Sequence, residues 1–82
     1  LTDTKIRSME NSGSSNLFIF DAHRDAPKGF ALKIATSGRK SFIIQYPLQG
    51  RRKRMTLGSW PTYSAVAARE AAHKALLQVA VD

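Results

Sequence analysis

The sequence contains no cysteine, and this excludes disulfide bonds and zinc sites built from thiolates. Its two histidines, His23 and His73, lie far apart in the chain. No apolar run approaches the roughly 20 residues that a membrane-spanning helix needs, and no signal-like segment opens the chain. We therefore expect no metal, no cofactor and no membrane association.

Acidic residues are absent from residues 26–69, although the chain as a whole has six of them. The net charge of +7 arises entirely in this segment, because the rest of the chain has more acidic than basic residues. Such segregation of charge is typical of a surface that binds a polyanion. The nine basic residues of the segment are Lys28, Lys33, Arg39, Lys40, Arg51, Arg52, Lys53, Arg54 and Arg69.

The composition is that of a folded domain, with 43% hydrophobic and 23% charged residues in a chain of 82. This length allows one domain with a modest core. We expect a single domain over residues 1–82, partly flexible over residues 1–16. The sequence has no paired carboxylates, no nucleophile with a neighbouring base and no phosphate-binding loop, so an enzyme is not expected.

Apolar and polar residues alternate with period two in three segments separated by short glycine-containing turns, which is typical of an antiparallel meander. A short apolar run before them is a further strand, and the chain opens with a helical turn that Thr2 or Asp3 caps. The predicted strands are residues 17–20, 29–35, 41–48 and 52–58.

A helix is predicted from Ala65 to about Val81, with Ser64 as its N-cap. Its small apolar side chains form one stripe and would allow close packing on the sheet; they are Ala65, Ala68, Ala72, Ala75, Leu76 and Val79. The predicted fold is α+β: a three-stranded antiparallel β-sheet, plus a short N-terminal strand, packed on one C-terminal α-helix.

The helix is expected to cover the apolar face of the sheet, which carries Phe30, Leu32, Ile34, Phe42, Ile44, Tyr46, Met55 and Leu57. The opposite face is polar and cationic, and turn residues extend it. The predicted binding residues are Lys33, Arg39, Lys40, Gln45, Arg51, Arg52, Lys53, Arg54 and Thr56.

A sheet of a few strands backed by a helix is narrow enough to enter the major groove of DNA. Arg52 and Arg54 are two residues apart on a strand and point to the same side, where guanidinium groups can pair with guanine edges. Gln45 can pair with adenine in two hydrogen bonds, whereas lysines and turn residues suit phosphates.

Four motifs carry a resemblance to a known family: LTDTKIRS, GFALKIATSGRKSF, GRRKRMTLGSWP and YSAVAAREAA. Together they resemble the N-terminal arm-type DNA-binding domain of phage and prophage tyrosine recombinases (integrases). The resemblance implies binding of double-stranded DNA at arm-type repeats, other recombinase protomers as partners and a bacterial cytoplasmic, nucleoid-associated location. It also implies that recombinase catalysis belongs to a region outside this domain.

Individual positions support the resemblance to different degrees. Lys40 matches a basic position that opens the second strand of the family's meander, and Arg51, Arg52 and Lys53 match its basic third strand. Gly58, Pro61 and Arg69 match its signature. The family usually has arginines along the middle strand, where this chain has Ile43, Gln45 and Pro47, so we expect base recognition to depend on the third strand.

Other roles remain open for some residues. We favour a structural role for Arg69 and a hydrophobic plug for Trp60, and Ile43 either contacts a thymine methyl group or is covered by the N-terminal segment. Two other functions are possible: binding of RNA or single strands, and docking of an acidic protein or a neighbouring recombinase protomer. The first is disfavoured because Phe30, Phe42 and Tyr46 fall on the apolar face.

Overall fold

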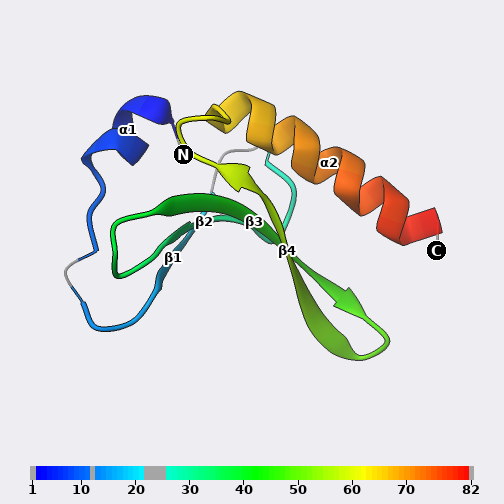
Figure 1. Ribbon diagram of the computed structural model, residues 1–82. Coiled ribbons are helices and arrows are strands. Elements are labelled where there is room, and N and C mark those ends of the chain that lie inside the picture. Colours follow the sequence, from blue (N-terminus) through cyan, green and yellow to red (C-terminus); the bar gives the residue numbers. More distant parts are fainter. Residues whose placement is uncertain (1, 12, 22–25, 82) are drawn as a thin grey trace.

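The computed structural model describes residues 2–11, 13–21 and 26–81, with side chains up to Gln78. The expectations for His23, for most of the 21–28 loop and for the side chain of Val79 lie outside the described residues. The elements follow one another as α1 (Asp3–Ser8), β1 (Leu17–Phe20), β2 (Phe30–Ile34), β3 (Lys40–Leu48), β4 (Arg51–Ser59) and α2 (Ala65–Val81) (Figure 1).

The strands form one antiparallel sheet in the order β1-β2-β3-β4, which confirms the α+β class and the meander. The sheet has four strands rather than three with a separate short strand. The N-terminal run joins it because β1 pairs with β2 in full register, from Leu17 opposite Ile34 to Phe20 opposite Ala31. Ile19 then packs against the core, so the alternation of β1 matches that of β2.

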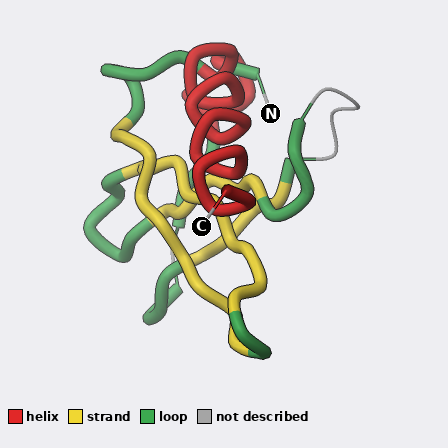
Figure 2. Tube along the Cα trace, turned by 90° about the vertical axis from the view of Figure 1, so that its right-hand side faces the viewer, coloured by secondary structure: helices red, strands yellow, loops and turns green. Residues whose placement is uncertain are grey.

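Helix α2 crosses one face of the sheet, over β3 and β4 (Figure 2). We call this the helix face; its core is completed by Ile6 from α1. The predicted alanine stripe is confirmed, since the alanines face the sheet and are almost fully buried. Phe30 and Phe42 stack under the helix with ring centroids 5.8 Å apart and planes inclined by 6°. The buried sheet residues of this face are Phe30, Leu32, Ile34, Phe42 and Ile44.

Both helices begin at the expected caps. The Ser64 hydroxyl accepts a hydrogen bond from the Ala67 amide at 3.1 Å, and the Thr2 hydroxyl accepts one from the Lys5 amide at 3.3 Å. These side chains satisfy amides that have no partner within the helix. Of the two possible caps of α1, Thr2 is therefore the one used.

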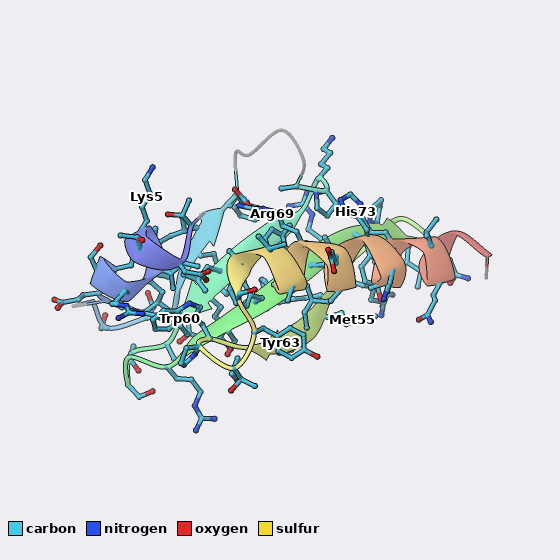
Figure 3. All side chains as sticks on the ribbon, turned by 90° about the horizontal axis from the view of Figure 1, so that it is seen from above. Lys5, Met55, Trp60, Tyr63, Arg69 and His73 are labelled. Atoms are coloured by element: carbon cyan, nitrogen blue, oxygen red, sulfur yellow. The ribbon has the colours of Figure 1, made fainter. Side chains whose placement is uncertain are left out.

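Asp3 instead joins α1 to the start of α2. Its Oδ1 accepts hydrogen bonds from the Ala65 amide at 2.9 Å and from Trp60 Nε1 at 3.2 Å. Trp60 lies between α1 and the start of α2 and packs against the core, which confirms it as a hydrophobic plug (Figure 3).

Arg69 also has the structural role that the sequence favoured. Its Nε lies 2.9 Å from Asp21 Oδ2, and the side chain of Asp21 is fully buried while that of Arg69 is 12% exposed. This ion pair ties α2 to the residue that follows β1, on the opposite side of α2 from Met55 and Tyr63 (Figure 3).

Strands β3 and β4 continue beyond the rest of the sheet. The pairing of β2 with β3 ends at Phe30 opposite Ile44, whereas β3 and β4 remain paired as far as Leu48 opposite Arg51. Residues 45–48 and 51–54 therefore form a two-stranded ribbon that projects from the domain (Figure 1). The turn that joins them has positive φ at Gln49 (52°) and Gly50 (77°), which suits the twist of a two-residue hairpin.

Candidate nucleic-acid interface

The four consecutive cations of the sequence lie in this projecting ribbon, on β4. Each is opposite an uncharged residue of β3: Arg51 faces Leu48, Arg52 faces Pro47, Lys53 faces Tyr46 and Arg54 faces Gln45. All four side chains are exposed. The run is thus part of a folded strand, and its backbone direction sets where each charge points.

Strand alternation divides the run between the two faces of the sheet. Residues directly opposite each other in an antiparallel pair share a face. Arg51 and Lys53 therefore lie on the helix face, beyond the end of the core, because their partners follow Phe42 and Ile44 in alternation. Arg52 and Arg54 lie on the opposite face, which carries no helix in the described part of the chain (Figure 2).

We call this second surface the open face. It is continuous across all four strands, and its residues belong to one side of the pleat. They are Phe18 and Phe20 of β1, Ala31 and Lys33 of β2, Ser41, Ile43, Gln45 and Pro47 of β3, and Arg52, Arg54 and Thr56 of β4.

Five of the predicted binding residues meet on the open face: Lys33, Gln45, Arg52, Arg54 and Thr56. Arg39 is exposed in the turn between β2 and β3. Lys40, Arg51 and Lys53 face the other side, since Lys40 is opposite Ile34. The structure thus brings together one subset of the predicted residues and separates it from the other cations.

Lys40 is occupied in holding α1. Its Nζ donates to the Ile6 carbonyl at 2.7 Å and lies 5.2 Å from the centroid of the Trp60 ring. The Ile6 carbonyl also accepts the Met9 amide at 3.1 Å, and lysines near the C-terminal end of a helix commonly bond its last carbonyls. This half-buried position assigns Lys40 a structural contact within the domain.

The charge of the open face is of one sign. None of the four strands contains Asp or Glu. Of the described acidic residues, Asp3 and Asp21 are bonded within the fold, and Glu10 and Glu70 lie outside the sheet. Among the residues that the structure describes, Arg52 and Arg54 therefore present guanidinium groups with no acidic neighbour on this surface.

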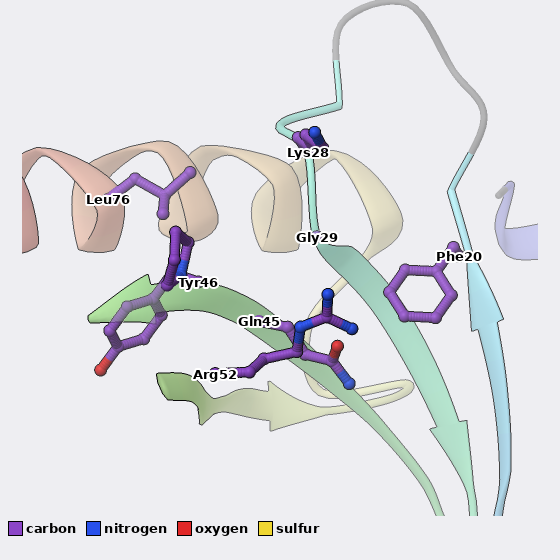
Figure 4. A pocket seen from close by; sticks show the side chains of 8 residues that line it. Phe20, Lys28, Gly29, Gln45, Tyr46, Arg52 and Leu76 are labelled. Carbon is purple, nitrogen blue, oxygen red and sulfur yellow. The ribbon is translucent and has the colours of Figure 1, made fainter. Parts of the chain in front are cut away.

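A hollow of about 420 Å³ lies where the ribbon leaves the sheet. The side-chain ends of Gln45 and Arg52 lie next to each other there, with Phe20 across from them and Lys28 on the adjoining loop (Figure 4). Gly29 allows this close corner: its φ is +93° and its carbonyl accepts the Gln45 amide at 2.9 Å. The sequence prediction did not include Lys28, which lines the same hollow from the loop that precedes β2.

The sequence prediction also did not include the aromatic residues of β1. Phe18 and Phe20 lie on the open face because they alternate with Leu17 and Ile19, a pattern that four residues alone do not establish. Phe30, Phe42 and Tyr46 lie on the helix face as expected, but that prediction did not consider β1, where Phe20 is 52% exposed on the open face. Ile43 is fully buried, which excludes an exposed contact with a thymine methyl group and leaves the alternative that the N-terminal segment covers it.

Metal or membrane chemistry finds no support in the part of the chain that the structure describes. No group of three or more His, Cys, Asp or Glu side chains there is arranged to hold a metal ion. No described helix is both long and apolar enough to cross a membrane.

A small α+β domain whose sheet carries cationic and amide side chains on one face, with a helix on the other, has the architecture of a nucleic-acid-binding module. The sequence matches the arm DNA-binding domain family over residues 1–82, so the chain belongs to that family, the domain found in phage integrases. This is a non-catalytic binding domain, and the family indicates DNA as its partner. A comparison with curated proteins finds no match to this sequence.

Proposed function

We propose that this domain binds double-stranded DNA sequence-specifically at arm-type sites, with the open face of its sheet in the major groove. The binding would support site-specific integration and excision by a parent tyrosine recombinase in the bacterial cytoplasm, together with other recombinase protomers. The observation that carries the proposal is that Gln45, Arg52 and Arg54 lie side by side on a face where the described residues include no helix and no acidic side chain.

The chemistry of these side chains matches that of base edges. An arginine fork pairs with O6 and N7 of guanine, and a glutamine amide pairs with N6 and N7 of adenine. The projecting ribbon has the width of two strands, which the major groove admits. We assign base recognition to these three residues and phosphate contact to the surrounding cations Lys28, Lys33 and Arg39, along with the ribbon cations of the helix face.

The amount of charge on this surface predicts the salt dependence. If about five cations contact phosphates, the logarithm of the affinity falls with the logarithm of salt concentration with a slope of roughly −4 to −5. That dependence arises from released counterions and carries no sequence information. Specificity therefore has to be measured separately from the slope.

The test compares variants that remove charges from the open face of the ribbon with variants that remove charges from its helix face. A preferred duplex is first selected from a random pool with the 82-residue chain, and affinities are then measured by fluorescence anisotropy between 50 and 200 mM salt. Two double variants are compared. One combines Arg52→Gln with Arg54→Gln on the open face, and the other combines Arg51→Gln with Lys53→Gln on the helix face. Each removes two positive charges, so their electrostatic losses are comparable.

The expected results differ between the pairs. Because one bidentate contact with guanine contributes about 1–3 kcal/mol of discrimination, the open-face pair should weaken binding to the preferred duplex by roughly 30-fold or more relative to a scrambled duplex. The helix-face pair should weaken both duplexes equally. Equal losses for both pairs would contradict recognition by the open face and would indicate a non-specific electrostatic anchor.

Two further measurements distinguish duplex binding from single-strand binding and from docking of an acidic protein. Stronger binding of single-stranded oligonucleotides than of any duplex would indicate stacking on the exposed Phe20 instead. No binding of any duplex at 50 mM salt would refute the proposal and would favour docking of an acidic protein partner.

A further inference from the structure

Two apolar residues of the open face are fully buried although no helix lies over them. Ala31 and Ile43 are both 0% exposed, and they are directly opposite each other in the central strands. On the outer strands, Phe20 and Thr56 continue the same row. Within the described part of the chain, a side chain of the open face that folds back over the sheet would account for the burial of Ala31 and Ile43.

Arg54 and Phe18 are placed to supply this cover. The guanidinium carbon of Arg54 lies 4.3 Å from the centroid of the Phe18 ring. The two residues come from opposite edges of the sheet, since Arg54 is opposite Gln45 and Phe18 is opposite Lys33. A line between them crosses the row of Ala31 and Ile43 diagonally.

The arginine side chain consequently lies flat across the sheet. Its methylene stem covers apolar surface while its charged end remains at the surface, as long cationic side chains commonly do. The methyl side chain of Ala31 leaves room for this crossing, which a larger residue at that position would obstruct. A contact between the first and last strands that crosses this row fits the full burial of Ala31 and Ile43 beneath it.

The contact leaves the hydrogen-bonding groups of Arg54 available. In an arginine the N–H groups point outward in the guanidinium plane, whereas attraction to an aromatic ring acts at the face of that plane. Among the described residues, Arg54 has no hydrogen bond or ion pair, in contrast to Arg69 with its bond to Asp21. Its donors are therefore positioned but not consumed.

We propose that Phe18 is a positioning residue for DNA recognition: its ring holds the Arg54 guanidinium over the sheet in the orientation that contacts a guanine. The inference rests on the proposed function and adds to it a residue that contacts Arg54 rather than the DNA. Ordering of the arginine before binding reduces the loss of side-chain freedom when the base contact forms.

The test compares Phe18→Leu with Phe20→Leu. Both changes replace an aromatic residue of β1 on the open face by an apolar one, but only the first removes a ring that contacts a cation. Each variant is measured against the preferred duplex and against duplexes in which each guanine is replaced in turn. Arg54→Lys, which keeps the charge and loses the planar fork, identifies the guanine that Arg54 contacts.

We expect Phe18→Leu to reduce the discrimination at that same guanine by roughly two- to fivefold, because an exposed contact between a cation and an aromatic ring has about this strength. Discrimination at the other positions and the salt slope should stay unchanged, and Phe20→Leu should resemble the wild type. In the free protein, the Arg54 Hε and Hδ resonances should lose their ring-current shift only in Phe18→Leu.

Unchanged discrimination in Phe18→Leu, with the ring-current shift lost and the melting temperature lowered, would overturn the proposal and leave the pair as a cover for Ile43. A loss at a guanine other than that of Arg54, or equal losses in both phenylalanine variants, would also overturn it. If the wild type selects no preferred duplex, the proposed function itself fails, which is a separate result.

Discussion

Replacing Asp3 by alanine should destabilise the whole domain, because its carboxylate joins three elements. Its Oδ1 accepts the Ala65 amide at the start of α2 and the indole N–H of Trp60, which follows β4. Asp3 itself is the first residue of α1. Without this acceptor, two partly buried donors lose their partner, and the three elements lose their common attachment point.

The expected magnitude follows from these two hydrogen bonds. A bond to a charged acceptor contributes about 1.5–3 kcal/mol, and the lower end applies here since both are only partly buried and water can replace the carboxylate in part. We expect Asp3→Ala to lower the free energy of unfolding by about 2–3 kcal/mol. For a domain of this size, that corresponds to a fall in melting temperature of roughly 10–20 °C.

Asp3→Asn separates geometry from charge. The amide oxygen can still accept both bonds, so the loss should be mainly the favourable interaction of a negative charge with the N-terminal end of α2, about 0.5–1 kcal/mol. Thr4→Ala is the matched control, since Thr4 is an exposed neighbour in the same helix, and it should change stability by less than about 0.5 kcal/mol.

The free energies of unfolding of these variants are measured by urea unfolding, which is followed by far-ultraviolet circular dichroism and by fluorescence. The chain has one tryptophan, so the fluorescence reports on Trp60 alone. A loss of stability below about 0.5 kcal/mol in Asp3→Ala would refute this role of Asp3. Equal losses in Asp3→Ala and Thr4→Ala would also refute it. A loss in Asp3→Ala that disappears in a Trp60→Phe background would assign it to the indole bond alone.

Two further predictions concern the sheet. Gly29→Ala should destabilise the domain by more than about 2 kcal/mol, since φ is +93° and an added Cβ would meet the Gln45 carbonyl. Gly38→Ala has the same φ but open space around it, so it should lower stability by only about 1 kcal/mol. Equal losses for the two variants in urea unfolding would refute the role of the close approach to Gln45. Lys40→Gln should lower the free energy of unfolding by about 1–2 kcal/mol, because the hydrogen bond to the Ile6 carbonyl is lost. The salt slope of DNA binding should stay unchanged. A slope reduced by about one would show that Lys40 contacts a phosphate.

The elements of this fold are largely determined by local patterns. Period-two alternation places β2, β3 and β4 within a residue or so of their observed bounds, because each strand has one buried face. Ser64 and the alanine stripe define α2 for the same reason. A structural role was also expected for Arg69, since a charge near a packed stripe needs a partner, and the structure supplies Asp21 as that partner.

Other features depend on contacts between residues far apart in the sequence. Strand alternation already places Arg52 and Arg54 on one side, but the position of Arg51 and Lys53 beyond the end of the core follows from how far β4 pairs with β3. The sequence analysis did not predict that Lys40 holds α1, because only the fold brings Ile6 and Trp60 to it.

The open face is the clearest case of a feature that depends on contacts between residues far apart in the sequence. Local patterns predict that one segment carries the positive charge and that strands present it on a face opposite an apolar one, because charge and alternation can be read along the chain. Tertiary contacts are needed to establish that β1 joins the sheet and that Phe18 meets Arg54 across it. Their contact spans four strands, and no spacing within either strand encodes the distance between them.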